Sequence, residues 1–471
     1  MRTKINNTVN RKLIILIFAV FITAFPVSLF SATLTVCSSA CSYTTLALAI
    51  AGAASGDTIQ LQQNITEDIT LDSFSKTLTI TSDGTRRTWT NSSARNLYFT
   101  NTGGYNITIQ NLDMVNTGGS ETVLMNQAGS LYFRNVKISN TTGSGKLVYM
   151  QNGGNMYFYQ SELVGNALTP VGIQIASGVN YPSGVYAENT IFREIGNGNA
   201  VQCDQNSGSN MMYIYNCTFE GNKTAYNSLS AGLIKNSLFI NNTDDVSVSG
   251  SGALTNFTYC GFSQQTTFSG TTGNIFGLTP VNVVVNLSGH DLHLVCSGNS
   301  VVDAGTDMSA FYTVDKDGVT RPQGPAYDMG AYECPVLNLS KSASSTFAYL
   351  GDTITYCLTY TNSSSSDRDT NIWDTVPANT LYLGCSGGCD LVGGTIVHWF
   401  LTVGAGYSGT LCFWVKVTGY PFINGESGFF ADADLRKLQA SGSTHSILAL
   451  DGWKFWMAGA DGYVKKNREE R

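Results

Sequence analysis

The sequence predicts an all-β protein: a right-handed parallel β-helix (solenoid) followed by an immunoglobulin-like β-sandwich. A short template of strand residues recurs at a long, nearly regular interval, and longer alternating strands follow it. Runs of helix-forming residues are nearly absent. The 471 residues include 49 glycines but only 9 prolines, and Asn, Thr and Ser crowd between short apolar runs. Such a composition favours many strands joined by tight turns.

The template has two alternating apolar positions, a polar pivot, and two more apolar or small positions one residue out of step. In the copy N-I-T-I-Q-N-L-D-M, Ile107 and Ile109 precede Asn111, and Leu112 and Met114 follow it. The slip at the pivot indicates a bend between two strands that face one core. The pivots are Asn111, Asn135, Gln160, Asn189, Asn216 and Asn236, with a looser copy at Tyr259.

The spacing of the pivots separates a solenoid from a sandwich. Successive pivots lie 24, 25, 29, 27, 20 and 23 residues apart, which is the length of a solenoid coil. Asn suits a corner because it tolerates the left-handed backbone region. A sandwich of hairpins is the alternative, but its strands would be joined by two-residue turns rather than by bends at a fixed long period.

The N-terminus has the features of a secretory signal at residues 1–31. Four basic residues within the first twelve precede an apolar stretch from Leu13 to Phe30, although its length leaves an uncleaved anchor open. We therefore expect a secreted or cell-surface protein, with a bacterial outer membrane as one location. The net charge of -7 provides no basic stripe, which argues against a nucleic-acid partner.

Eleven cysteines in an exported chain indicate disulfides and at least one thiol outside an intramolecular pair. Proximity along the chain nominates four pairs and leaves Cys203, Cys217 and Cys260 over. The nominated pairs are Cys37 with Cys41, Cys296 with Cys334, Cys357 with Cys412, and Cys385 with Cys389. Zinc is the alternative for the two C-x-x-x-C pairs, but no His or further Cys completes four ligands, so we expect no metal and no cofactor.

The closing segment of the helix carries specific motifs: D-L-H-L-V from Asp291, V-V-D-A-G from Val301, D-K-D-G-V-T-R-P from Asp315, and D-M-G-A-Y-E from Asp328. In this order they resemble the terminal coil and cap of exported bacterial β-helix proteins of the choice-of-anchor type. The resemblance implies a β-helix over residues 32–335, with a short helix at 44–54 plugging its start. Two F-x-x-N copies, at Phe219 and Phe239, are also similar to polymorphic outer-membrane-protein repeats.

After Pro335 the strands lengthen, as in G-D-T-I-T-Y and L-T-Y-T-N. Residues 336–420 resemble the DUF11 module, which implies a β-sandwich serving as a surface spacer. Residues 421–471 remain an unassigned tail. Charged residues within its most apolar stretch argue against a membrane span, so contact with a membrane is expected only through the signal segment or an unrecognised anchor.

A catalytic β-helix would need paired carboxylates, or a calcium-holding cluster with a base. The adjacent pair Asp244 and Asp245 should point opposite ways on a strand. The four histidines lie outside the central coils, and Asp315–Gly318 lacks the remaining ligands of a calcium loop, so a capping turn is favoured. The sequence thus shows no recognisable catalytic residues.

Tyrosines recur at fixed offsets from the pivots. Tyr132, Tyr157, Tyr186 and Tyr213 stand three residues before them, and Tyr159 and Tyr215 stand one residue before them. With coils about 4.8 Å apart, these rings should stack on one outer face. Such a face can bind sugars or proteins, or can serve only to stabilise the solenoid.

These features lead to the expectation of a non-enzymatic binding, adhesion or structural protein. Its tyrosine face would bind a polysaccharide or a cell-surface partner, with the sandwich as a stalk. The alternative is a polysaccharide lyase or glycoside hydrolase on the β-helix scaffold. A purely structural spacer is the third possibility.

Overall fold

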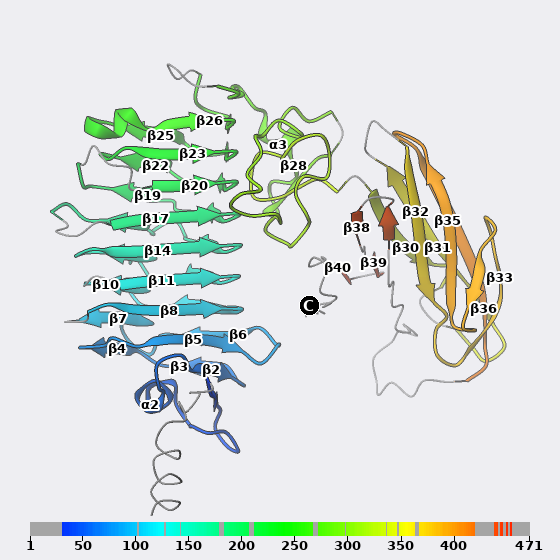
Figure 1. Ribbon diagram of the computed structural model, residues 1–471, viewed down its shortest axis with the longest axis horizontal. Helices are drawn as coiled ribbons and strands as arrows, with labels where there is room; N and C mark the ends of the chain where they lie inside the picture. Colours follow the sequence, from blue (N-terminus) through cyan, green and yellow to red (C-terminus); the bar gives the residue numbers. More distant parts are fainter. Residues whose placement is uncertain are drawn as a thin grey trace, which may run out of the picture.

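The computed structural model is a stack of β-coils with an irregular cap and a β-sandwich beside it (Figure 1). It describes residues 31–419, apart from the gaps at 101–102, 127–128, 142, 179–182, 207–211, 267–271, 297, 336, 346–347 and 363–366, and then the strands within 438–454. The predicted signal segment at residues 1–30, and most of the tail, lie outside the described residues. The predicted all-β class and parallel solenoid are confirmed.

Three parallel sheets run along the solenoid. Sheet A contains β1 (Thr33–Val36), β2 (Thr58–Leu61), β5 (Thr77–Ser82), β8 (Tyr105–Gln110), β11 (Gly129–Arg134), β14 (Gly154–Tyr159), β17 (Ser183–Glu188), β20 (Met212–Tyr215), β23 (Gly232–Lys235) and β26 (Asn256–Thr258). Sheet B contains β3 (Ile65–Thr66), β6 (Arg87–Thr90), β9 (Leu112–Asn116), β12 (Lys137–Asn140), β15 (Glu162–Val164), β18 (Ile191–Arg193), β21 (Thr218–Glu220), β24 (Leu238–Ile240) and β27 (Gly261–Phe262). Sheet C contains β4 (Ile69–Asp72), β7 (Leu97–Thr100), β10 (Val123–Met125), β13 (Val148–Met150), β16 (Val171–Ile175), β19 (Asn199–Cys203), β22 (Thr224–Ser228) and β25 (Asp244–Val248).

The core repeats from coil to coil because equivalent residues are paired in register. Phe192, Phe219 and Phe239 stack with successive ring centroids 4.7 Å apart, and Phe262 continues the stack at 4.9 Å. The three left-over cysteines are free thiols in this interior. All four nominated disulfides are present. They are typical of a protein that has left the cytoplasm.

The start of the solenoid is closed by α2 (Leu46–Gly52), within the predicted helical stretch. The Thr45 hydroxyl caps the helix by accepting from the Leu48 amide at 3.2 Å. The Glu67 carboxylate accepts from the amides of Leu46 and Ala47 at 2.8 and 3.0 Å. The free amide groups of the first helical turn are therefore hydrogen-bonded to the adjacent coil.

Every predicted pivot adopts the left-handed conformation, with φ between 47° and 57°. Stacked pivots do hydrogen-bond, since Asn135 Nδ2 donates to Asn111 Oδ1 at 3.0 Å and Asn236 Nδ2 donates to Asn216 Oδ1 at 3.1 Å. Between these pairs the ladder is interrupted. Gln160 there donates to a main-chain carbonyl of the cap.

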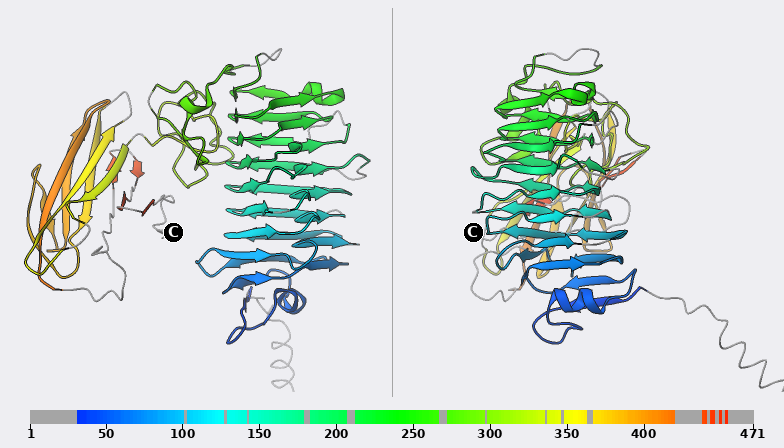
Figure 2. Two further views of the ribbon diagram at one scale, coloured as in Figure 1. Left: turned by 180° about the vertical axis from the view of Figure 1, so that it is seen from behind. Right: turned by 90° about the vertical axis from the view of Figure 1, so that its left-hand side faces the viewer.

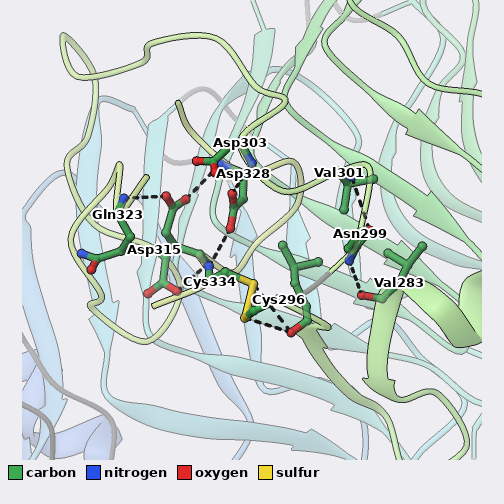
Figure 3. The surroundings of a disulfide bond; sticks show 11 residues. Val283, Cys296, Asn299, Val301, Asp303, Asp315, Gln323, Asp328 and Cys334 are labelled. Atoms are coloured by element: carbon green, nitrogen blue, oxygen red, sulfur yellow. Dashed lines mark hydrogen bonds between the residues drawn. A yellow bond between two sulfur atoms is a disulfide. The ribbon is translucent and has the colours of Figure 1, made fainter. Parts of the chain in front are cut away.

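The cap, residues 276–335, contains α3 (Pro280–Val283), β28 (Val284–Asn286) and β29 (Asp291–Leu294), and lies beside the upper coils (Figure 2). The Cys296–Cys334 disulfide joins the segment just after β29 to the C-terminal end of the cap. Asp328 organises the turn beside it by accepting from the amides of Asp303 and Cys334 at 2.7 and 2.6 Å (Figure 3). A short 3-10 helix, Gly250–Leu254, precedes the last coil.

Antiparallel strands in two sheets form the region after the cap. One sheet has the order β30 (Leu337–Ala343), β31 (Thr353–Asn362), β36 (Ser408–Val417), β33 (Thr380–Cys385). The other has the order β34 (Asp390–Val392), β35 (Ile396–Val403), β32 (Arg368–Thr375), β37 (Leu438–Ala440), β38 (Ser443–His445). A hairpin of β39 (Ala449–Leu450) and β40 (Trp453–Lys454) follows. In the part of the chain that the structure describes, no helix has the length and apolarity of a membrane span.

Candidate functional site

The outer face of sheet A collects the predicted tyrosines. Side chains alternate along each strand, so every second residue points outward, and the in-register pairing aligns these residues in rows. Among the described strand residues that point outward from sheet A, the charged ones are Arg134, Glu188 and Lys235. The face is therefore mostly aromatic and hydroxyl-bearing, with three charges at defined positions.

The first row contains Tyr132, Tyr157, Tyr186 and Tyr213. Successive ring centroids lie 4.5, 4.8 and 4.6 Å apart, with interplanar angles of 6°, 12° and 1°. The rings cover one another's faces, so a ligand meets mainly ring edges and hydroxyl groups. Hydrogen bonding to the phenol hydroxyls is thus the contact that this row offers a sugar.

The second row lies nearer the pivots and contains Arg134, Tyr159, Glu188, Tyr215 and Lys235 in consecutive coils. The Arg134 guanidinium lies 4.1 Å from the centroid of the Tyr159 ring. The order is cation, tyrosine, carboxyl, tyrosine, cation. Neither cation forms an ion pair with a described residue.

Glu188 is the central group of this second row. Its side chain is half-buried and accepts no hydrogen bond from the described residues. Burial raises the pKa of Glu188 to about 7, and the positive charge of Arg134 only partly offsets this effect. A carboxyl group with such a pKa exchanges its proton near neutral pH, as general acids and bases do.

The tyrosines next to Glu188 hold their protons at neutral pH. Burial, together with the neighbouring tyrosines and the Glu188 carboxylate, raises the pKa of Tyr215 to about 12. Burial and the Glu188 charge likewise raise the pKa of Tyr159. Each phenol is therefore a hydrogen-bond donor beside the carboxyl group.

The cap borders one end of this face. Its Phe311 ring lies 5.5 Å from the Tyr215 ring at an angle of 52°. Met308, Tyr312 and Tyr327 form a small core with Tyr215, against which Tyr213 and Leu233 also pack. The cap thus shields the upper part of the second row, and its Tyr312 lies close enough to Glu188 for an electrostatic interaction.

A second cluster of ionisable groups lies away from the tyrosine face, where the β28–β29 hairpin docks on sheet B. His290 Nδ1 lies 3.1 Å from Glu220 Oε2, and its Nε2 lies 3.3 Å from Glu194 Oε1. Arg193 contacts Glu194 and also pairs with Glu162 at 2.6 Å. A cavity of about 500 Å³ is lined by Glu220, Asn241, Val281, Val284, Val285, Asn286, Leu287, Ser288 and His290. The sequence places His290 outside the central coils. The folded cap nevertheless brings it into contact with Glu194 and Glu220 of those coils.

Other candidate groups have structural roles. Asp244 is exposed while Asp245 is buried and accepts from the Asn242 side chain and the Gln264 amide, which makes it a turn residue. Asp315 accepts from the Asp317 and Val319 amides at 2.8 Å and so forms a capping turn. Among the described residues, no group of three or more His, Cys, Asp and Glu side chains is arranged to hold a metal ion.

No protein-family model matches the chain, and no curated protein matches it. The resemblance to choice-of-anchor and DUF11 proteins therefore has no support beyond the parallel β-solenoid itself. A tailspike protein, gp49 of Acinetobacter baumannii bacteriophage Fri1, described as a capsular polysaccharide depolymerase, aligns with 77% of this chain and 67% of its own, at 11% identity and a TM-score of 0.26. Tailspike protein 4 of bacteriophage CBA120, solved as an enzymatically active domain, aligns with 77% of this chain and 62% of its own, at 13% identity and a TM-score of 0.17. At these identities the likeness concerns the fold alone.

The expectation of a non-enzymatic protein is wrong by this comparison. The two tailspike structures named above are described as a depolymerase and as an enzymatically active domain. The expectation rested on a search for paired carboxylates in sequence, which passed over Glu188, a single carboxyl group among the predicted tyrosines. Because packing rather than a charged partner raises its pKa, no sequence motif marks it.

Proposed function

We propose that this protein binds a polysaccharide along the outer face of sheet A and cleaves it at Glu188. The observation that carries the proposal is the second row, in which a half-buried carboxyl group without a hydrogen-bond partner among the described residues lies between Tyr159 and Tyr215. A structural carboxylate at such a position would be expected to accept hydrogen bonds from the surrounding protein.

The length of the face suits a chain-like ligand. Four tyrosine hydroxyls in the first row span three coil steps, or about 14 Å along the solenoid axis. Polysaccharides carry hydroxyl groups along their whole length, so a row of phenol donors and acceptors is complementary to them. The second row runs parallel to the first and places Glu188 beside the bound chain.

Glu188 suits proton transfer because a group with a pKa near the working pH is available in both protonation states. Cleavage of a glycosidic linkage requires a proton on the departing oxygen. The Tyr159 hydroxyl beside Glu188 is a further proton donor in the same row.

The remaining parts of the chain support display outside the cell. We propose that residues 1–31 direct export, that residues 32–335 form the functional β-helix, and that residues 336–420 are a spacer; the outer membrane is one location of such a protein. Mass spectrometry of the N-terminus of the mature protein tests the first point. Detection of an intact residue 1 in the exported form would contradict cleavage.

The function is tested by incubating the folded protein with a panel of acidic and neutral polysaccharides, scoring retention and the release of reducing ends. We expect cleavage of at least one of them, and Glu188→Gln should slow it by about 100-fold or more while changing retention by less than about threefold. Glu121→Gln is the matched control, because Glu121 pairs with Arg95 before β10 of sheet C, away from the tyrosine face. Retention should fall when Tyr157, Tyr186 and Tyr213 are changed together to Ser.

Absence of cleavage throughout the panel would contradict the proposal. If Glu188→Gln retained full activity while Glu220→Gln lost it, cleavage would instead belong to the cavity at His290.

A further inference from the structure

We infer that the reaction is a β-elimination on a uronate-containing, anionic polysaccharide, with Glu188 as the base and Arg134 as the group that binds the substrate carboxylate. This inference rests on the proposed function and adds the substrate class and the type of bond cleavage. The inference follows from the ionisable groups on the outer face of sheet A and from their order along the second row.

The supply of carboxyl groups argues against hydrolysis. Most glycoside hydrolases use two carboxyl groups, about 5 to 9.5 Å apart, on either side of the scissile bond. The outward-facing positions that the structure describes on sheet A provide one carboxyl group, Glu188, and its charged neighbour is the cation Arg134. The bordering cap places Phe311 and Tyr312 next to Tyr215.

The cations suit an anionic chain. The protein carries a net charge of -7, yet this face has two cations without ion-pair partners among the described residues and one carboxyl group with a pKa near 7. Arg134 and Lys235 lie four coil steps apart, or about 19 Å. A local positive excess on an acidic protein attracts a polyanion to this face.

Elimination uses the three kinds of side chain in the second row: a guanidinium, a carboxylate and a phenol. The C5 proton of a uronate is acidic because the adjacent carboxylate accepts the developing negative charge, and Arg134 would stabilise that charge in a two-point contact. The Glu188 carboxylate takes the C5 proton, the C5–H electron pair forms the C4=C5 double bond, and the C4–O4 bond breaks. The departing O4 receives the hydroxyl proton of Tyr159, since Tyr215 is covered by the cap. Solvent then returns a proton to the tyrosine and removes one from Glu188, so no water is added to the sugar chain.

The direction of the pH dependence distinguishes the two mechanisms. As a base, Glu188 must be ionised, so elimination should accelerate as pH rises through about 7. As the acid of a hydrolase it must be protonated, and the rate should fall over the same interval. The groups that interact electrostatically with Glu188 are Arg134, Tyr159 and Tyr215 on sheet A, Tyr312 of the cap, and the buried thiol of Cys217, whose pKa is raised by burial. The pKa values of these tyrosines are raised, so the tyrosines remain neutral throughout this interval.

The experiment uses the full-length folded protein with polygalacturonate, alginate, hyaluronan and chondroitin, each beside its carboxyl-reduced, neutral form. The readouts are retention, reducing ends, and the ultraviolet absorbance of the C4=C5 double bond. We expect at least one acidic polymer to yield the double bond and its reduced form to bind about tenfold more weakly or worse. Arg134→Gln should reduce the formation of the double bond by about tenfold or more, with partial recovery in Arg134→Lys.

Arg95→Gln is the matched control, because Arg95 pairs with Glu121 away from this face. Release of reducing ends without the double bond, or equal cleavage of the reduced polymers, would overturn the inference and leave the proposed function standing. Cleavage of none of the acidic or neutral polymers would overturn both.

Discussion

Asn216 provides the sharpest test of how the cap is held to the coils. This pivot is fully buried, with φ of 47°. Its Nδ2 donates to the carbonyls of Asp328 and Gly330 at 2.6 and 3.0 Å, and its Oδ1 accepts from the Tyr312 hydroxyl at 2.6 Å and from Asn236 Nδ2 at 3.1 Å. One amide therefore joins two parts of the cap to the neighbouring coil.

Asn216→Ala removes all four hydrogen bonds. At about 1 kcal/mol net for each bond, and about 1 kcal/mol for alanine in the left-handed region, the expected loss is about 5 kcal/mol. Asn216→Gly should recover the backbone part, about 1 kcal/mol, since glycine adopts this conformation freely. The difference between the two variants separates conformation from hydrogen bonding.

The measurement is native-state hydrogen exchange of peptides covering residues 301–335, whose opening free energy should fall by the stated amounts. Asn256→Ala is the control, because Asn256 is an exposed residue of β26 with no capping role. Peptides from β35 in the sandwich should not change. A fall of less than about 1 kcal/mol in Asn216→Ala would refute the reasoning, because it is smaller than the conformational term and one hydrogen bond combined.

Three further predictions concern the cap and the sandwich. Arg321 and Glu333 form a fully buried ion pair at 2.7 Å. Arg321→Met should therefore lower the free energy of unfolding, measured by urea denaturation, by about 3 to 5 kcal/mol. A loss below about 1 kcal/mol would contradict a structural role for this pair. Burial lowers the pKa of His293, but its two aspartate partners outweigh this and raise the pKa above 6.5. The stability that these two aspartates provide through protonated His293 is therefore complete below about pH 6.5 and is lost as pH rises through the folded-state pKa of His293. The urea midpoint should fall over that interval. His293→Asn should flatten this pH dependence. Replacing Cys357 and Cys412 by Ala opens a cross-link across 55 residues and should cost the sandwich up to about 4 kcal/mol in calorimetry, with unchanged coils as the internal control.

The coils were predictable from sequence because their signals are local. Three local signals defined each corner: a two-residue period before the pivot, a one-residue slip at the pivot, and a residue type that tolerates positive φ. Every predicted pivot adopts the left-handed conformation. The same local logic aligned the tyrosines, since Tyr157 and Tyr186 occupy equivalent positions in their strands.

Features that depend on contacts between residues far apart in the sequence were not predictable from the repeat. Glu188 stands one residue before its pivot, as Tyr159 and Tyr215 do, so its outward position was readable from the repeat. Its elevated pKa was not, because that depends on burial among neighbouring rows. His290 was set aside because no periodicity connects it to Glu220, 70 residues earlier.

The interrupted pivot ladder imposes an order on folding. Coils can be added one after another, because each contacts its predecessor 20 to 29 residues earlier. The side chains of Gln160 and Asn189, however, donate to Asp315 and Val314, 155 and 125 residues later in the chain. These corner amides therefore stay with solvent until the cap has been synthesised and has folded back onto the coils. Closure of the cap is the last event on this side of the solenoid, and it completes the border of the tyrosine face at the same moment.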